Sequence, residues 1–254
     1  MGTDTTTFTT AELEAAWEEF QRLGARGRDW PAWAALFTDD ALYIEHCIGR
    51  FHGSAGVLAF ILDAMKPVAP MTFSVDWAII EVPYVAFNIW NHMPGLGDGE
   101  RYSFSNLTLL EHAGGGKWKL EEDFYSPRDS GRTVMKWFTN GGNPEMAADP
   151  TIVHESLAPP PADDDRAGVD AMVAAWLAGT PHYSPDGEVW THGVGRVPGT
   201  DAAPFTTPPD VIVRDGRRAF LRCGNTAVAL IHGGGGTIRF EERASNPTEV
   251  IPVL

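Results

Sequence analysis

At 254 residues, the chain is long enough for one large domain or two ordinary ones, and its 43% hydrophobic and 21% charged residues are typical of a globular protein. The net charge of −15 argues against nucleic acid and anionic membranes as partners, because phosphate-rich surfaces attract Lys and Arg. The two cysteines form no CxxC pattern, the N-terminus lacks a basic-then-apolar signal, and no apolar run approaches the ~20 residues of a membrane span, so we expect a cytoplasmic protein.

The first part of the chain predicts helices followed by a strand. Thr9 and Glu12 have the spacing of a capping box, and Leu13, Trp17 and Phe20 follow at helical spacing. The next expected elements are a short helix at 29–37, a strand at 41–47 and a helix beginning near Ser54.

From residue 71 onward the pattern changes to strands. Four of them are expected, at residues 72–80, 84–92, 101–111 and 117–125, separated by proline and glycine turns. Helices followed by a meander of strands predict an α+β fold with helices on one face of a curved sheet. Shorter helices are expected at 134–138 and at 169–176, on either side of an acidic, proline-rich linker at 158–165.

Two stretches of the chain are repeated later in the sequence, and each repeat aligns without a gap. Residues 110–127 resemble residues 230–247, and His112, Glu121 and Pro127 recur 120 positions on, as His232, Glu241 and Pro247. Residues 40–53 resemble residues 186–199 at an offset of 146, and His46 there recurs as His192.

Two echoes in the same order predict a tandem duplication, and the change of offset indicates that the second copy has lost 26 residues, mainly the third helix and the 94–99 loop. We expect a full domain at 1–135, a linker at 136–165 and a reduced second copy at 166–254. The copies are expected to pack as an internal pseudo-dimer, so that the protein is a monomer or a homodimer.

The first copy resembles the nuclear transport factor 2-like superfamily, and within it the SnoaL-like branch. The resemblance is carried by residues 29–41, by residues 43–53 with the helix that follows, and by residues 115–125. It implies a cone-shaped, curved antiparallel sheet with helices on its concave face, closed by three helices around an apolar pocket. Relatives include ketosteroid isomerases, polyketide cyclases, limonene epoxide hydrolases and scytalone dehydratases, and also proteins without catalytic activity.

His46 is the first candidate catalytic residue. It shares a strand face with Leu42 and Ile44, so we expect its ring to face an apolar interior, where a neutral imidazole is a usable base. The resemblance places it, with a shift of one residue, where ketosteroid isomerases carry their Asp base. The alternative is a core histidine with a structural role, since His192 repeats it.

Asp123 is the second candidate. The segment 121–125 resembles the last-strand motif in which SnoaL-like cyclases and limonene epoxide hydrolases place a catalytic Asp. Strict alternation puts Asp123 on the face opposite Trp118, so a β-bulge is needed for both to reach one pocket. The second copy has Arg243 at this position, which points to a site in the first copy only. The alternative is a solvated strand end.

The expected ligand-binding residues carry hydrogen-bond donors or aromatic rings; they are Tyr43, Asn88, Trp90, Tyr102 and Trp118. The Arg and second Asp that the resemblance to epoxide hydrolases requires have no match here. The histidines of the first copy are not at metal-ligand spacing, so neither a metal nor another cofactor is expected.

The sequence thus favours an enzyme with a cofactor-free acid/base pocket for a hydrophobic carbonyl compound, steroid- or polyketide-like, with isomerase, cyclase or dehydratase chemistry. The alternative is a non-catalytic module that binds a hydrophobic ligand or another protein. The position of His46 and Asp123 relative to one cavity distinguishes the two.

Overall fold

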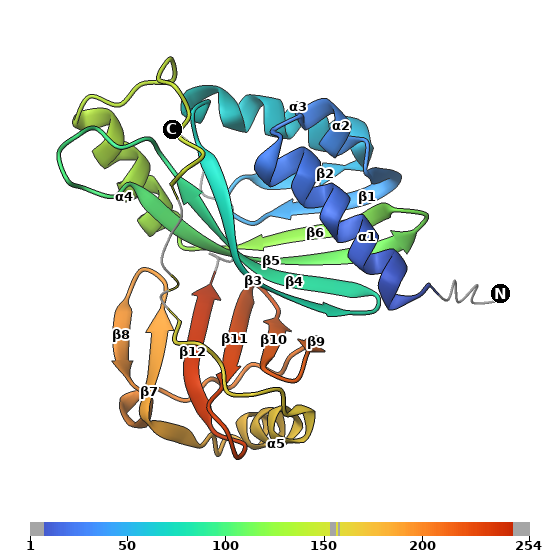
Figure 1. The fold of residues 1–254 in the computed structure, drawn as a ribbon, viewed down its shortest axis with the longest axis vertical. Helices are drawn as coiled ribbons and strands as arrows, with labels where there is room; N and C mark the ends of the chain where they lie inside the picture. The colour runs from blue at the N-terminus through green and yellow to red at the C-terminus, as the bar shows by residue number, and fades with distance from the viewer. Residues whose placement is uncertain (1–7, 153–155, 157, 246–254) are drawn as a thin grey trace.

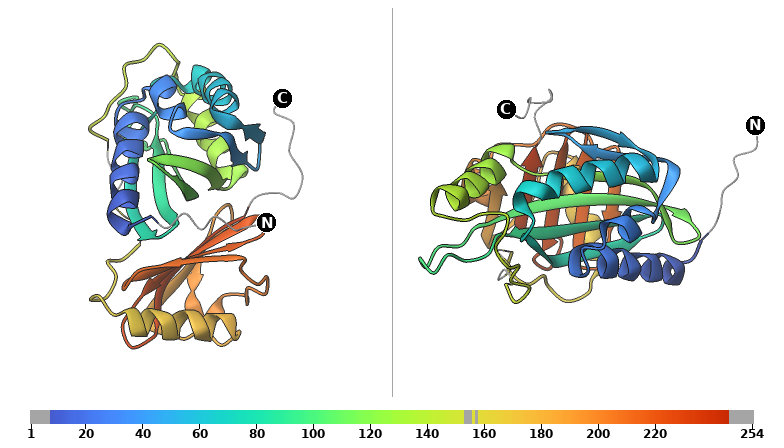
Figure 2. Two further views of the ribbon diagram at one scale, coloured as in Figure 1. Left: turned by 90° about the vertical axis from the view of Figure 1, so that its right-hand side faces the viewer. Right: turned by 90° about the horizontal axis from the view of Figure 1, so that it is seen from above.

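The computed structural model of the protein describes residues 8–152, 156 and 158–245, and it contains two six-stranded sheets that lie face to face (Figure 1). Helices cover the side of each sheet that points away from the other sheet, so the molecule has a helix–sheet–sheet–helix arrangement (Figure 2). No helix of the described residues is long and apolar enough to cross a membrane. Pro247, the last residue of the expected repeat, lies outside the described residues.

The first sheet has the order β2-β1-β6-β5-β4-β3, and only the β1–β6 pair in it is parallel. Its strands are β1 (Phe37–Glu45), β2 (Gly49–His52), β3 (Thr72–Glu81), β4 (Tyr84–His92), β5 (Ser103–Gly114) and β6 (Lys117–Phe124). Its helices are α1 (Thr10–Gln21), the π-helix η1 (Arg22–Arg26), α2 (Trp30–Ala34), α3 (Gly53–Met65), the short η2 (Lys66–Val68) and α4 (Pro127–Thr139). The predicted α+β fold with a curved sheet is confirmed, although the sheet is mixed rather than wholly antiparallel.

Local sequence explains how the first helices begin. Thr9 and Glu12 form the predicted capping box of α1, and Asp29 caps α2. Helix α3 begins one residue before Ser54, whose hydroxyl instead donates to the carbonyl of Ala34. Gly53 is required there, because it has a φ of +67° and a Cβ would lie 2.5 Å from the carbonyl oxygen of Asp39.

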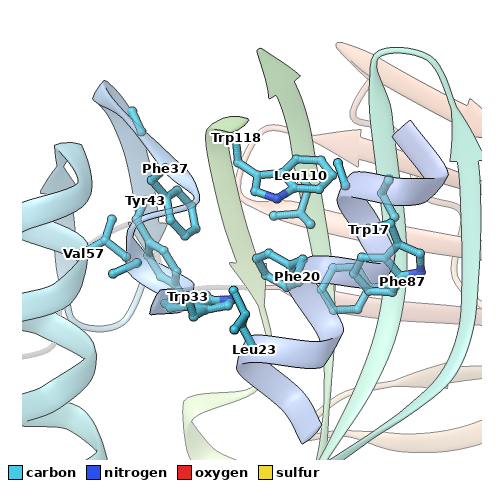
Figure 3. Close-up of a cluster of buried hydrophobic side chains, with 14 of the residues drawn as sticks. Trp17, Phe20, Leu23, Trp33, Phe37, Tyr43, Val57, Phe87, Leu110 and Trp118 are labelled. Atoms are coloured by element: carbon cyan, nitrogen blue, oxygen red, sulfur yellow. The ribbon is translucent and has the colours of Figure 1, made fainter. Parts of the chain in front are cut away.

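The buried faces of α1, α2 and α3 pack on the concave face of the first sheet. Phe20 of α1 lies in the middle of this core, between Trp33, Phe87 and Trp118 (Figure 3). The aromatic rings meet mostly edge to face or tilted, the arrangement that their quadrupoles favour.

The second sheet repeats the order of the first, as β8-β7-β12-β11-β10-β9, again with one parallel pair. Its strands are β7 (Tyr183–Thr191), β8 (Gly195–Pro198), β9 (Val211–Arg214), β10 (Arg218–Cys223), β11 (Thr226–His232) and β12 (Ile238–Ser245). One helix, α5 (Arg166–Leu177), covers it, and the short η3 (Gly199–Asp201) stands where the first copy has α3. The predicted reduced second copy is therefore confirmed.

The predicted domain limits stay a prediction, but α4 runs across the limit set at residue 135. It packs on β5 through Trp137, whose indole donates to the carbonyl of Pro94. Helix α4 thus belongs structurally with the first sheet, because its one fully buried side chain is fixed by that domain.

The faces of the two sheets that point away from the helices form a shared core. It contains buried apolar side chains from both sheets, among them Leu107, Leu109, Phe124, Phe220 and Ala229. The rings of Phe124 and Phe220 approach edge to face across this boundary, at 6.3 Å between centroids. Both faces of the central strands are therefore buried.

Polar contacts across the boundary follow the duplication. Glu122 of β6 contacts His46 at 2.7 Å and accepts a hydrogen bond from Arg222 of the second sheet at 3.1 Å. Glu242 of β12 contacts His192 at 2.7 Å and accepts from Asn88 of the first sheet at 3.1 Å. Each copy thus supplies a His–Glu pair, and it also supplies a side chain that donates a hydrogen bond to the glutamate of the other copy.

The donors occupy equivalent positions. Asn88 lies opposite Leu107, and Arg222 lies opposite Ala227, 120 residues after Leu107. The two sheets therefore meet about a pseudo-twofold axis, as expected for an internal pseudo-dimer. This contact occupies the outer face of each sheet, which is the face that points away from its own helices.

Because each outer face is already covered by the other copy, we predict a single chain in solution. Light scattering coupled to gel filtration should give a mass close to 27.6 kDa. A mass near twice that value would contradict this prediction, and would mean that another surface forms a dimer.

Candidate active site

The open end of the first sheet's concave face holds a cavity of about 200 Å³ beneath α2 and α3. Most of its wall is aromatic or aliphatic, and the described residues that line it include no Lys, Arg or His. The apolar part consists of Phe20, Gly24, Ala25, Trp30, Trp33, Ile48, Phe60, Ile61, Ala64, Met65, Val68, Met71, Phe73, Phe87, Ile89 and Phe104. The polar part consists of Tyr43, Glu45, Asn91, Asn106, Thr108, Glu121, Asp123 and Tyr125.

Three acidic side chains come together in this apolar wall, each about 5% exposed. Glu45 lies on β1, and Glu121 and Asp123 lie two residues apart on β6, so that both point to the same face of the sheet. The parallel pairing of β1 with β6 places Glu45 opposite Asp123 and Tyr43 opposite Glu121. The four side chains therefore form one compact group.

The β-bulge that the sequence required is present. Glu111 of β5 lies opposite Leu120 of β6, but His112 lies opposite Trp118, so the pairing shifts by one residue at Lys119. The shift restores Trp118 to the concave face, where it packs in the core, while Glu121 and Asp123 also face inward.

Asp123 is held by hydrogen bonds from two hydroxyl groups. Tyr43 Oη donates to Oδ2 and Thr108 Oγ1 donates to Oδ1, each at 2.5 Å. Both donors are themselves buried, so the contacts are shielded from water. Hydrogen bonds of this kind stabilise a carboxylate more than a carboxylic acid.

The two glutamates are less fully satisfied. Glu45 Oε1 and Glu121 Oε2 are buried and have no hydrogen-bond partner among the described residues. A buried polar atom without a partner costs about 1–3 kcal/mol relative to the hydrogen-bonded group. Both side chains line the cavity, so a bound molecule can supply the missing contacts.

Burial gives the three carboxyl groups unequal acidities. It raises the pKa of Glu45 and of Glu121 well above the ordinary value of 4.5, and the neighbouring charge of Asp123 raises both further. Burial also raises the pKa of Asp123, but the hydrogen bonds from Thr108 and Tyr43 oppose that rise. The hydrogen bonds from Thr108 and Tyr43 thus favour the ionised form of Asp123, whereas burial and the charge of Asp123 favour the protonated forms of Glu45 and Glu121.

A carboxylate beside two carboxylic acids can move a proton and donate hydrogen bonds within one cavity. The arrangement needs no cofactor for this chemistry. The described residues contain no group of three His, Cys, Asp or Glu side chains placed to hold a metal ion.

Of the seven residues predicted for the site, Asp123 and Tyr43 line the cavity, and Tyr43 donates a hydrogen bond to Asp123. His46 is not with them. Its ring lies on the opposite face of the sheet, where Nε2 contacts Glu122 and the ring packs against Phe124 at 5.3 Å. This corrects the expected orientation of His46, whose ring lies beside Glu122 and Phe124 and not beside Asp123.

The other predicted ligand-binding residues also lie outside the cavity. Asn88 reaches Glu242, and Trp90 stacks on Trp190, both at the boundary between the sheets. Tyr102 packs against α4 and donates to Asp98, and Trp118 is fully buried in the core. The cavity is lined instead by the β4 residues that alternate with Asn88 and Trp90, which are Phe87, Ile89 and Asn91.

Sequence reasoning did not single out Glu45 or Glu121. The signal was available for Glu45, since it shares a strand face with Tyr43 in the expected strand 41–47. Glu121 is retained as Glu241 in the second copy, and this repetition indicated a role in the fold. Only the pairing of β1 with β6 shows that these residues surround Asp123.

Residues 15–120 match the family model described as "SnoaL-like domain". The first domain is therefore a SnoaL-like domain with the nuclear transport factor 2-like fold. A search of the curated proteins gave no match for the sequence.

Solved structures are similar to about half of the chain. A hypothetical protein with a ketosteroid isomerase-like fold from Catenulispora acidiphila, in complex with trimethylamine, is 20% identical over 50% of this chain and 95% of its own, with a TM-score of 0.41. TerC, co-crystallised with polyporic acid, is 14% identical over 49% and 98%, with a TM-score of 0.41. A putative SnoaL-like polyketide cyclase from Shewanella denitrificans is 12% identical over 48% and 96%, with a TM-score of 0.40.

The position of His46 predicts that it stabilises the fold. Replacing it in a His46→Ala variant removes one hydrogen-bond partner of the buried Glu122 and should lower the free energy of unfolding by about 1–3 kcal/mol. Urea denaturation measures this difference, and the matched control is His52→Ala, since His52 is exposed on β2. Equal stabilities of the two variants would contradict the structural role.

Proposed function

We propose that the SnoaL-like domain at residues 15–120, together with the end of β6, is an acid/base enzyme that acts without a cofactor on a small hydrophobic carbonyl compound. The observation that carries the proposal is the group of Glu45, Glu121 and Asp123, three buried carboxyl groups of unequal acidity in one apolar cavity. Isomerisation, cyclisation and dehydration all need a base and a hydrogen-bond donor in this relation.

In the proposed reaction, the Asp123 carboxylate removes a proton from the carbon next to the carbonyl group. The electrons of the broken C–H bond form a carbon–carbon double bond, and negative charge develops on the carbonyl oxygen. Protonated Glu45 or Glu121 donates a hydrogen bond to that oxygen through its unpartnered oxygen atom. If the compound carries a carbon–carbon double bond one position further from the carbonyl group (β,γ-unsaturated), Asp123 then returns the proton to the γ carbon. The electrons of the dienolate re-form the carbonyl group and leave the carbon–carbon double bond conjugated with it, which completes an isomerisation.

The cavity wall supports this chemistry. An apolar surrounding strengthens hydrogen bonds to a developing charge and keeps Glu45 and Glu121 protonated. Thr108 and Tyr43 hold the Asp123 carboxylate in one orientation. The volume of about 200 Å³ lies below the ~300–1,000 Å³ typical of ligand pockets, which favours a compound of one or two rings over a larger one.

The second candidate function is binding of a hydrophobic ligand without catalysis. One observation favours it: His46, expected as a base in the pocket, lies outside the cavity, and Asp123 already receives hydrogen bonds from two hydroxyl groups. In that case Glu45 and Glu121 recognise the ligand and no proton leaves it.

Deuterium exchange distinguishes the two functions without knowledge of the natural substrate. The probe is 2-tetralone, an aromatic ketone with acidic hydrogens next to the carbonyl, dissolved with the protein in heavy water. The wild-type protein should accelerate exchange of those hydrogens, followed by proton NMR. Asp123→Asn should slow the catalysed exchange by about 10²–10⁴-fold, because it removes the base.

His46→Ala is the matched control, and it should retain the exchange activity because its ring lies on the other face of the sheet. Exchange in Asp123→Asn as fast as in the wild type would contradict the proposed base. Binding of 2-tetralone without any acceleration by the wild-type protein would instead support the non-catalytic function.

A further inference from the structure

The second domain has a pocket of its own. It lies at the C-terminal end of α5, between the start of β7, the segment that begins with η3, and the end of β12, and has a volume of about 320 Å³. The residues that line this α5 pocket are Trp176, Gly179, Pro181, His182, Tyr183, Gly199, Thr200, Ala202, Ala203, Pro204, Phe205 and Arg243.

The α5 pocket is the altered counterpart of the cavity in the first domain. Arg243 lies opposite Thr191 on the parallel neighbour strand, as Asp123 lies opposite Glu45. Tyr183 pairs with Ile238, as Phe37 pairs with Trp118. The positions of Tyr43, Glu45 and Asp123 are thus taken by Val189, Thr191 and Arg243, whereas Glu121 is kept as Glu241.

The charge of the wall is reversed by these replacements. Three acidic side chains and no basic one line the first cavity, whereas Arg243 and His182 line the α5 pocket and none of its described lining residues is acidic. The acid next to Arg243 is Glu241, which receives hydrogen bonds from Arg243 Nε at 2.5 Å and from Tyr183 Oη at 2.6 Å.

Glu241 is completely buried, while the Arg243 side chain keeps 11% of its exposure. Of the two charged groups in this ion pair, only the guanidinium of Arg243 therefore faces the pocket. The carboxylate behind the guanidinium fixes its direction, and the carbonyl of Ala203 accepts a hydrogen bond from Nη1 at 2.8 Å. A guanidinium held in this way is suited to attract a carboxylate and to donate a charge-assisted hydrogen bond to it.

Three aromatic side chains, those of Trp176, Tyr183 and Phe205, also line the α5 pocket. Trp176 and Phe205 stack at 5.6 Å with an angle of 26°, and the Arg243 guanidinium lies 5.8 Å from the centre of the Phe205 ring. The ring of Tyr183 packs so closely on Gly199 that a Cβ there would lie 2.2 Å from it. Aromatic walls next to one cation match a planar ring that carries one negative charge.

We propose that the second domain binds a small aromatic carboxylate in the α5 pocket, with Arg243 as the residue that contacts the carboxylate. The duplication has then produced two pockets of opposite polarity in one chain, and the second one recognises a ligand without counterparts of Glu45 and Asp123.

Benzoate is the probe for this proposal, titrated into the full-length protein and followed by the indole NMR signal of Trp176, which a Trp176→Phe variant assigns. We expect saturable binding in the millimolar range or tighter, and weaker binding of benzamide, the neutral compound of the same shape. The variant Arg243→Gln/Glu241→Gln should weaken benzoate binding about tenfold or more; it replaces both members of the ion pair, so that no buried charge is left alone.

Two controls are matched to this variant. Arg196→Gln removes an exposed positive charge from β8 of the same domain, and Asp123→Asn alters the first cavity; neither should change the dissociation constant for benzoate. Phe205→Ala, which removes one aromatic wall and keeps both charges, should also weaken binding, and it tests the pocket if the double variant does not fold.

The proposal is overturned if benzoate shows no saturable binding, if benzamide binds equally well, or if Phe205→Ala and the Arg243→Gln/Glu241→Gln variant both bind benzoate as the wild type does. It is also overturned if binding is lost in Asp123→Asn, because the ligand would then occupy the first cavity.

Discussion

The burial of β6 on both of its faces is the constraint from which the site follows. Glu121 and Asp123 point into the cavity, while Glu122 and Phe124 between and beside them point into the core shared with the second sheet. Strand alternation allows no side chain to serve both faces. The second sheet therefore acts as the support that fixes β6, and the residues that hold the two sheets together are separate from those that face the cavity.

Duplication explains why both faces can be occupied. Each copy uses the same outer-face pair, His46 with Glu122 and His192 with Glu242, so the contact between the sheets is retained on both sides of the pseudo-twofold axis. The concave faces were free to diverge, since they do not meet each other. There Asp123 corresponds to Arg243, and the third helix of the first copy is reduced to η3. Stability is thus shared between the copies, whereas their pockets differ in polarity.

The sequence predicted the elements better than it predicted which way their side chains point. The capping box at Thr9, the limits of β4 and the reduced second copy all follow from local pattern and from the repeats. The orientation of His46 could not be predicted from its apolar neighbours, because side chains on both faces are buried at the end of β1. The group around Asp123 depends on the pairing of β1 with β6, whose residues are some 80 positions apart in the chain. No periodicity within a single strand reports such a contact.

The proposed proton transfer requires that Glu45 and Glu121 hold protons in the native protein while Asp123 is ionised. Carbon-13 NMR of the side-chain carboxyl groups, assigned with Glu45→Gln and Glu121→Gln variants, measures this directly. Both glutamates should titrate well above their ordinary pKa of 4.5, because burial raises each pKa and the charge of Asp123 raises it further. In Asp123→Asn, both titrations should move back toward lower pH. Titration of both glutamates near 4.5 in the folded wild-type protein would contradict the account.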